Sequence, residues 1–229
     1  MSEEEPTLRR YEGERGTYIA RDEHKTARQN EELWDSRAET YDTRFRLTRV
    51  TQRKLVSLLS LGDNPRILDL ACGTGWALLY AADRTNGQGE FYGVDNSSKM
   101  IERAQANFQS YSNPHFYKSR VEELPFDDDF FDVVMSSNAF HHFSNPEKAL
   151  REANRVLKPN GKLYILDMTA NNALMRLADR FIHKMEPAHV KFYSTREFQA
   201  LFEGAGLCYI TSKRIFPTIE VHMAERSNF

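Results

Sequence analysis

The stretch from Arg66 to Leu79 constrains the fold of this chain more than any other. It begins with a nearly continuous apolar run, Ile67-Leu-Asp-Leu-Ala71, which is typical of a parallel strand buried on both faces. The run ends at Cys72-Gly-Thr-Gly75, and a helix-forming segment follows from Trp76 to about Asp83. A strand, a glycine turn and a helix in this order place backbone N–H groups beside a ligand. We therefore expect a nucleotide-like ligand here; an ordinary strand-to-helix turn is the alternative.

Strand and helix patterns alternate after this stretch. Apolar runs predict strands at 66–71, 90–95, 115–118, 131–135 and 162–167, with helices at 97–108 and 146–157 between the later ones. We expect Pro159-Asn-Gly161 to end the helix before the fifth strand. Helices at 173–186 and 194–204 follow, and a hairpin of 207–211 and 215–223 is split by Lys213-Arg214. This alternation predicts an α/β fold with a doubly wound, mostly parallel sheet.

The part of the chain before the glycine turn has a different character. Residues 1–21 are charged and lack an apolar period, so we expect a flexible leader. Helices are predicted from Asp22 to about Arg37 and, after Glu39-Thr-Tyr41-Asp42, through about Leu61. We therefore predict a single domain, 1–229, made of a leader (1–21), a helical cap (22–61), a cofactor-binding core (62–167), a lid insertion (168–195) and a last helix with a terminal hairpin (196–229).

Composition excludes several classes of protein. The 229 residues carry a net charge of −2, and no basic patch is visible, so we expect no nucleic-acid partner. No apolar run approaches the roughly 20 residues needed to cross a bilayer, so stable membrane insertion is not expected. The two cysteines, Cys72 and Cys208, form no metal-ligand or disulfide pattern. A cytoplasmic protein without a metal is the expectation, and its oligomeric state stays open.

An acidic residue ends the second predicted strand. Asp95 stands twenty positions after Gly75, where a carboxylate can accept the hydroxyls of a ribose. The third glycine of the dinucleotide fingerprint is absent, because position 78 is Leu. That glycine lets a helix and a strand pack closely around a pyrophosphate. The pattern therefore favours a ligand with a ribose and no phosphates over NAD.

Six segments, in this order and spacing, resemble those of class I S-adenosylmethionine-dependent methyltransferases. They are Ile67-Leu-Asp-Leu-Ala-Cys-Gly-Thr-Gly75, Gly93-Val-Asp-Asn-Ser-Ser-Lys-Met100, Val121-Glu-Glu-Leu-Pro-Phe126, Phe131-Asp-Val-Val134, Ala139-Phe-His-His-Phe143 and Glu152-Ala-Asn-Arg-Val-Leu-Lys-Pro-Asn-Gly161. Within that family the chain is most similar to the small-molecule branch with the ubiquinone/menaquinone biosynthesis methyltransferases. The resemblance implies S-adenosylmethionine as cofactor. It also implies a Rossmann-like sheet of seven strands, of which the last hairpin supplies one antiparallel strand.

The resemblance assigns roles to individual residues. Asp69, Gly73 and Gly75 would surround the methionine part of the cofactor, Asp95 would hold the ribose, and Met100 would pack near the adenine. Three more residues are implied to bind the cofactor: Ala71, Asn96 and Asn138.

One position departs from the family pattern. Arg120 stands where the family commonly has an acidic residue that accepts the adenine amino group. An arginine cannot accept a hydrogen bond. The backbone of Val121 or the side chain of Glu122 would therefore take that role.

Methyl transfer from such a cofactor needs few protein groups, because positioning and exclusion of water do most of the work. His141 and His142 are candidate general bases, with His189 and Tyr193 as further options, and Tyr41 matches a tyrosine that closes over the cofactor in this branch. A lid from 22–46 and 168–195 would cover the substrate. Its aromatic and methionine residues favour an apolar or aromatic small molecule, unless they only pack the lid onto the core: Trp34, Tyr41, Met168, Met175, Phe181, Phe192 and Tyr193. Two alternatives stay open, a methyltransferase acting on a macromolecule and a non-catalytic S-adenosylmethionine-binding protein.

Overall fold

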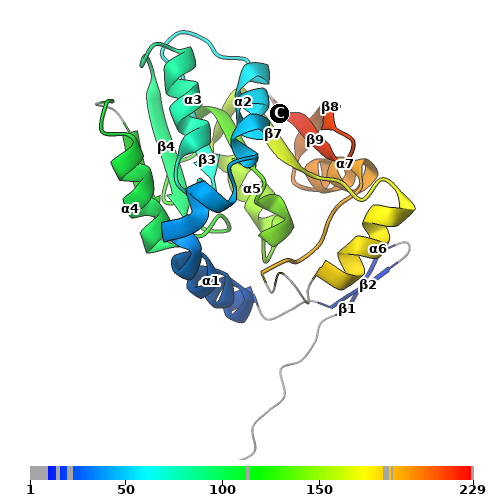
Figure 1. The fold of residues 1–229 in the computed structure, drawn as a ribbon. Coiled ribbons are helices and arrows are strands. Elements are labelled where there is room, and N and C mark those ends of the chain that lie inside the picture. Colours follow the sequence, from blue (N-terminus) through cyan, green and yellow to red (C-terminus); the bar gives the residue numbers. More distant parts are fainter. Residues whose placement is uncertain are drawn as a thin grey trace, which may run out of the picture.

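A seven-stranded sheet forms the centre of the protein (Figure 1). The structure is a computed structural model that describes residues 10–13, 16–19, 23–111, 114–182, 186 and 188–227. Across the sheet the strands are β5 (Pro114–Lys118), β4 (Glu90–Asp95), β3 (Arg66–Leu70), β6 (Phe131–Ser137), β7 (Leu157–Met168), β9 (Ile219–Arg226) and β8 (Leu207–Phe216). The first five strands are parallel, and β9 is antiparallel to both of its neighbours. The predicted doubly wound sheet with one antiparallel strand is confirmed.

Helices cover both faces of this sheet. Helices α2 (Thr48–Leu58), α3 (Trp76–Arg84) and α4 (Ser98–Asn107) bury side chains in one apolar cluster. Helices α5 (Pro146–Val156) and α7 (Thr195–Gly204) bury theirs in a second cluster on the opposite face. Two capping motifs fix where helices begin. Asn145 caps α5, and Ser194 and Glu197 form a capping box at the start of α7.

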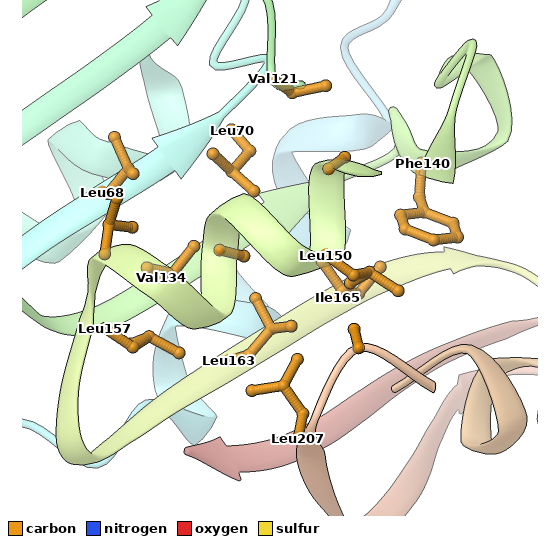
Figure 2. Packing of buried hydrophobic residues seen from close by; sticks show 14 of the residues in the cluster. Leu68, Leu70, Val121, Val134, Phe140, Leu150, Leu157, Leu163, Ile165 and Leu207 are labelled. Carbon is orange, nitrogen blue, oxygen red and sulfur yellow. The ribbon is translucent and has the colours of Figure 1, made fainter. Parts of the chain in front are cut away.

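The strands alternate their side chains between the two clusters. In β7, Leu163 and Ile165 belong to the cluster under α5, whereas Tyr164 and Leu166 belong to the cluster under α2 and α3. This alternation follows from the two-residue period of a strand. Figure 2 shows Leu150 of α5 and Ile165 of β7 among the buried side chains of the cluster under α5. Burial on both faces explains why the strand sequences are almost continuously apolar.

The N-terminal region differs from the prediction in two ways. Part of the expected leader is regular, because β1 (Arg10–Gly13) and β2 (Gly16–Ile19) form an antiparallel pair. The rest of the leader, 1–9, 14–15 and 20–21, lies outside the described residues. The helix expected to end near Arg37 is one longer helix, α1 (Glu23–Arg44). Polar residues 39–42 resembled a break in the sequence, but they contain no glycine or proline that would end a helix.

The C-terminal half holds three further corrections. Strand β7 begins at Leu157, so the turn-like Pro159-Asn-Gly161 lies within it, next to a register shift opposite β6. The predicted break at Lys213-Arg214 is wrong: Arg214 pairs with Glu220 across the hairpin, and the strands are joined after Phe216. Helix α6 (Ala173–Ile182) confirms the first part of the helix expected at 173–186, whereas 183–185 lie outside the described residues.

Candidate active site

A cavity that is open to solvent lies at the carboxyl ends of β3, β4 and β6. This is the edge of a parallel α/β sheet at which ligands bind. Its lining comes from α1, from the turns after the three strands, from the segment after β5, and from the 3₁₀ helix η1 (Phe140–His142) with its neighbours. The lining residues are Ala27, Asn30, Trp34, Tyr41, Ala71, Gly73, Asp95, Asn96, Met100, Ser119, Arg120, Val121, Glu122, Ser137, Asn138, Ala139, His142, Phe143 and Ser144.

The glycine turn bends under the cavity through left-handed backbone conformations. Gly73 has a φ of 54°, and Ala71, which has a Cβ atom, has the same value. Asn138, at the end of β6, also adopts a positive φ of 55°. Such conformations are costly for residues other than glycine and concentrate at functional sites. The backbone around the cavity is thus strained at the ends of two neighbouring strands.

Asp95 joins the second strand to the glycine turn. Its Oδ2 accepts a hydrogen bond from the Gly73 backbone N at 2.9 Å, and its Oδ1 accepts one from the Ser97 backbone N at 2.9 Å. Burial raises the pKa of Asp95 to about 6, although these backbone donors oppose the shift. The carboxylate lines the cavity and retains lone pairs for a ligand that donates hydrogen bonds.

Asp69 lies deeper, in β3 directly before the turn. The residue is fully buried, and neither carboxylate oxygen has a hydrogen-bond partner among the described residues. Burial, and then the nearby Asp95, raise the pKa of Asp69 well above its usual range. A buried carboxyl without a partner is costly. A ligand with a positive charge near the turn would offset this cost and favour the ionised carboxylate, so the two acidic acceptors fit a cationic amino-acid tail next to a ribose.

An aromatic wall from α1 closes the cavity above the turn. The Tyr41 ring lies 3.9 Å from the position that a Cβ on Gly73 would take. Trp34 meets Tyr41 edge-on at 6.1 Å between ring centroids and meets His142 at 5.2 Å. Burial, and then the charge of Asp95, raise the pKa of Tyr41, so its phenol stays protonated. Tyr41 can therefore donate a hydrogen bond into the cavity but cannot serve as a base near neutral pH.

Polar contacts of α1 cross the cavity and fix this wall. Asn30 Nδ2 donates to the His142 carbonyl at 3.0 Å, and Asn96 Nδ2 donates to the Ala27 carbonyl at 3.1 Å. The sequence analysis did not identify Ala27 or Asn30 as site residues. A signal was present: positions 27, 30, 34 and 41 share one face of a helix with a 3.6-residue period. The predicted end of the helix at Arg37 separated Tyr41 from the other three positions, although α1 runs to Arg44.

The two adjacent histidines have different surroundings. His142 lines the cavity, and its Nδ1 lies 3.0 Å from the Ala188 carbonyl, which can only accept a hydrogen bond. The proton therefore sits on Nδ1, and Nε2 is an acceptor. Burial, and then His141, lower the pKa of His142 well below its usual range. His141 lies outside the lining; its Nδ1 is 2.7 Å from Asp167 Oδ1, and its backbone N donates to Asp167 Oδ2 at 2.9 Å.

The wall after β5 contains the unusual Arg120. Its side chain lies beside Glu122, with Nε 3.4 Å from Glu122 Oε2. The other oxygen of Glu122 accepts hydrogen bonds from Ser144 Oγ at 2.6 Å and from the Asn145 backbone N at 3.2 Å. Glu122 is buried, so the arginine neutralises it in place. Because Glu122 is engaged on both oxygens, the Val121 backbone is the better candidate for a contact with the adenine amino group.

Most of the predicted site residues meet at this cavity. Ten of them line it: Tyr41, Ala71, Gly73, Asp95, Asn96, Met100, Val121, Glu122, Asn138 and His142. Asp69, Gly75 and His141 do not. Gly75 instead allows the turn and α4 to pack closely, because a Cβ there would lie 3.2 Å from the Ala104 Cβ of α4. Its φ of 82° also favours glycine. Sequence reasoning missed the serines of the lining, Ser119, Ser137 and Ser144, which carry no pattern of their own.

Of the aromatic and methionine residues expected to line the lid, only Trp34 and Tyr41 reach the cavity. Phe192 and Tyr193 are buried in packing, Tyr193 against Phe140 and Phe198. Phe181 is exposed on α6. The interpretation that such residues pack the lid onto the core is therefore correct for Phe192 and Tyr193.

The described part of the chain contains neither a cluster of side chains suited to a metal ion nor a helix suited to a membrane. No group of three or more His, Cys, Asp or Glu side chains there is arranged to hold a metal ion. None of the helices in the same residues combines the length and the apolar character that crossing a bilayer requires.

Comparison with known proteins identifies the family. Residues 61–206 match the model of a methyltransferase domain. Demethylmenaquinone methyltransferase of Thermotoga maritima is 36% identical over 153 residues, which cover 65% of each protein. An uncharacterized methyltransferase of Bacillus subtilis, YcgJ, is 35% identical over 150 residues, 63% of this chain and 57% of the relative. The matched region thus spans only about 57–65% of the length of these relatives.

Solved structures agree with this assignment. The crystal structure of YcgJ superposes with a TM-score of 0.66 at 30% identity, covering 72% of this chain and 71% of that one. A SAM-dependent methyltransferase from Aquifex aeolicus shares the fold, with a TM-score of 0.69 at 23% identity over 84% of this chain and 98% of that one. The resemblance expected from the sequence motifs is confirmed, and this chain belongs to the family of S-adenosylmethionine-dependent methyltransferase domains.

Proposed function

We propose that this protein transfers a methyl group from S-adenosylmethionine to a small, planar, hydroxylated aromatic acceptor of the quinol class. The observation that carries this proposal is the cavity at the strand ends, where Asp95 faces an aromatic wall of Trp34 and Tyr41. A flat acceptor suits such a wall, because aromatic rings stack or meet edge-on. Relatives named as demethylmenaquinone methyltransferase and 2-phytyl-1,4-naphtoquinone methyltransferase support the quinol class.

The residues of the glycine turn would hold the cofactor. Asp95 would accept hydrogen bonds from the two ribose hydroxyls, and Met100 would pack against the adenine. Asp69 would balance the positive charge of the methionine amino group from below the turn, and Asn138 would lie beside the methionine part. When bound, S-adenosylmethionine supplies a methyl group on a positively charged sulfur, which leaves as a neutral thioether when an acceptor atom attacks the methyl carbon.

His142 would orient the acceptor. Its Nε2 carries a lone pair, because Nδ1 donates to the Ala188 carbonyl. The lowered pKa of His142 keeps the ring neutral across the physiological range, so Nε2 can always accept a hydrogen bond from an acceptor hydroxyl. His141, held by Asp167, contacts the His142 ring at 4.0 Å between centroids and would act as a positioning residue.

Two finer expectations are part of the same proposal. We infer that the acceptor is a free small molecule and not nucleic acid, because the chain has a net charge of −2. Among the described residues that line the cavity, the only lysine or arginine is Arg120, which is paired with Glu122. We also infer a cytoplasmic address, to which two cysteines without a disulfide are suited.

The test has two parts. Calorimetry should detect binding of S-adenosylhomocysteine and none of NAD; binding of NAD alone would overturn the assignment. Release of S-adenosylhomocysteine should then be measured with a panel of quinols, phenols, thiols and amines. Turnover is expected with quinols, and turnover with thiols or amines only would refute the acceptor class.

The role of His142 is tested by substitution. His142→Gln should lower kcat about tenfold, because a hydrogen bond that orients the acceptor contributes about 1 kcal/mol, while S-adenosylhomocysteine affinity stays unchanged. His115→Gln is the matched control, since His115 stacks on Tyr92 at 4.6 Å and lies outside the cavity. Equal kcat values for the two variants would remove His142 from the mechanism.

A further inference from the structure

Helix α6 exposes an apolar row, although it lies within an otherwise packed fold. Leu174 is 74% exposed and Leu177 51% exposed, and the two stand three residues apart on one face of the helix. Phe181, one turn further on, is also exposed. None of the α6 residues is buried, whereas α2, α3, α4, α5 and α7 each bury side chains in the core. Contiguous exposed apolar side chains mark interaction surfaces more often than isolated ones.

The exposed charged side chains of α6 are all cationic. Arg176 and Arg180 are exposed next to the apolar row, and neither makes an ion pair with any residue that the structure describes. The acidic residue of the helix is engaged elsewhere: Asp179 Oδ1 lies 2.7 Å from His189 Nε2 and accepts the Phe192 backbone N–H at 2.8 Å. An apolar row flanked by arginines, with no exposed acid, is complementary to an anionic partner.

The helix is fixed relative to the candidate active site. The Asp179 contacts tie α6 to the segment that follows it, and Ala188 in that segment accepts the hydrogen bond of His142. The segment also reaches α1, because Glu186 receives two hydrogen bonds from Arg37 Nη1, at 2.7 and 2.8 Å. A partner bound to α6 would therefore be linked to the cavity through the segment that follows this helix.

We propose that α6 docks the enzyme on an anionic lipid bilayer, with Leu174 and Leu177 entering the interface and Arg176 and Arg180 contacting lipid phosphates. A second copy of the chain fits this surface less well, because a symmetric contact would bring four arginines together without an acid. This inference deepens the proposed function: an apolar acceptor resides in a bilayer, and docking through the lid brings the cavity to it. Amphipathic helices of this composition bind membranes in the interfacial plane.

The experiment is co-sedimentation of the full chain with vesicles, with no methyl acceptor present. The chain is expected to bind vesicles that contain both phosphatidylglycerol and phosphatidylcholine. Its affinity for vesicles of phosphatidylcholine alone should be lower by at least about tenfold, because each arginine near an anionic surface adds to the binding free energy. The double variant Leu174→Glu/Leu177→Glu should lose binding by about tenfold or more, and Arg176→Gln/Arg180→Gln should lose the preference for phosphatidylglycerol. Absence of binding by the unmodified chain, or equal binding to both vesicle types, would overturn the proposal.

Two controls locate the effect. Leu47→Glu and Ile210→Glu change residues that are 84% and 52% exposed on other elements, and they should bind vesicles like the unmodified chain. A loss with Leu47→Glu as large as that of the α6 variant would refute the assignment to α6. An unchanged affinity for S-adenosylhomocysteine verifies that the variants are folded, because no α6 residue lines the cavity. Since no methyl transfer is measured, a negative result refutes docking and leaves the proposed activity unaffected.

Discussion

The affinity for the cofactor should depend on pH through Asp95. Burial raises the pKa of this carboxyl to about 6 in the empty protein. In the proposed complex the ribose hydroxyls would donate hydrogen bonds to the ionised form, so binding would require that Asp95 loses its proton. At pH 5 about one molecule in eleven carries an ionised Asp95, and above pH 7 nearly all do. The dissociation constant of S-adenosylhomocysteine should therefore rise about tenfold between pH 7.5 and pH 5, equivalent to about 1.4 kcal/mol.

Calorimetric titrations at half-unit steps between pH 5 and pH 8 measure this dependence. Asp95→Asn is the matched variant, because the amide has nearly the same shape and does not titrate. It should bind more weakly at pH 7.5, by about 1.5–3 kcal/mol for the lost charge-assisted hydrogen bonds, and its affinity should not change with pH. A flat profile for the unmodified protein, or a variant that retains the tenfold change, would refute the role of Asp95.

The raised pKa of Asp95 also makes the stability of the ligand-free protein depend on pH. The folded-state pKa lies above the unfolded value of 3.8, so folding favours the protonated carboxyl. The stability that this provides is fully present below about pH 4 and is lost as the pH rises through about 6. The upper bound of this contribution to the free energy of unfolding is about 3 kcal/mol, because a difference of one in pKa corresponds to about 1.36 kcal/mol. Urea unfolding should show the unmodified protein gaining stability relative to Asp95→Asn as the pH falls from 7 to 4.

Four further substitutions test the fold by urea unfolding. Phe198→Ala should cost about 3–5 kcal/mol, because the fully buried ring packs on the Phe140 ring at 5.0 Å between centroids. Gly89→Ala should cost more than about 1 kcal/mol, because its φ is 105° and the new Cβ would lie 2.5 Å from the Pro65 carbonyl oxygen. Gly204→Ala should instead stabilise the protein by about 0.5–1 kcal/mol, because the space around this glycine is open. Ser194→Ala should cost about 1 kcal/mol by removing the capping box of α7. Equal effects of the two glycine substitutions, or no effect of either of the others, would contradict this account.

The central sheet could be predicted because each of its parallel strands is buried on both faces. Ile67 and Leu68 point to opposite clusters and are both fully buried, so the sequence needs apolar residues at consecutive positions. Asp95 could be placed because the end of the second strand meets the end of the first. Both predictions rest on contacts between segments with strong local patterns.

The errors came from local signals that tertiary contacts override. Pro159-Asn-Gly161 has the chemistry of a turn, yet Leu157 pairs with Phe131 before it and Lys162 pairs with Val133 after it, so the strand includes the interruption. Arg214 resembled a break, but Glu220 on the facing strand gives it an ion-pair partner at 3.3 Å. Neither partner is near in sequence, and a single-sequence pattern does not contain that information.

The kind of ligand that suits the glycine turn depends on Leu78, whose side chain is buried in the core and does not line the cavity. Leu78 of α3 is fully buried in the cluster between this helix and the sheet, beside Ile67 and Val133. A glycine at this position would let the helix approach the strand closely, as in folds that hold a pyrophosphate at the helix N-terminus. Leu78 instead places a fully buried side chain at this position. Under the proposed function the turn would serve a ribose held by Asp95 and a charged tail near Asp69, and the packing of Leu78 in the core would disfavour a dinucleotide.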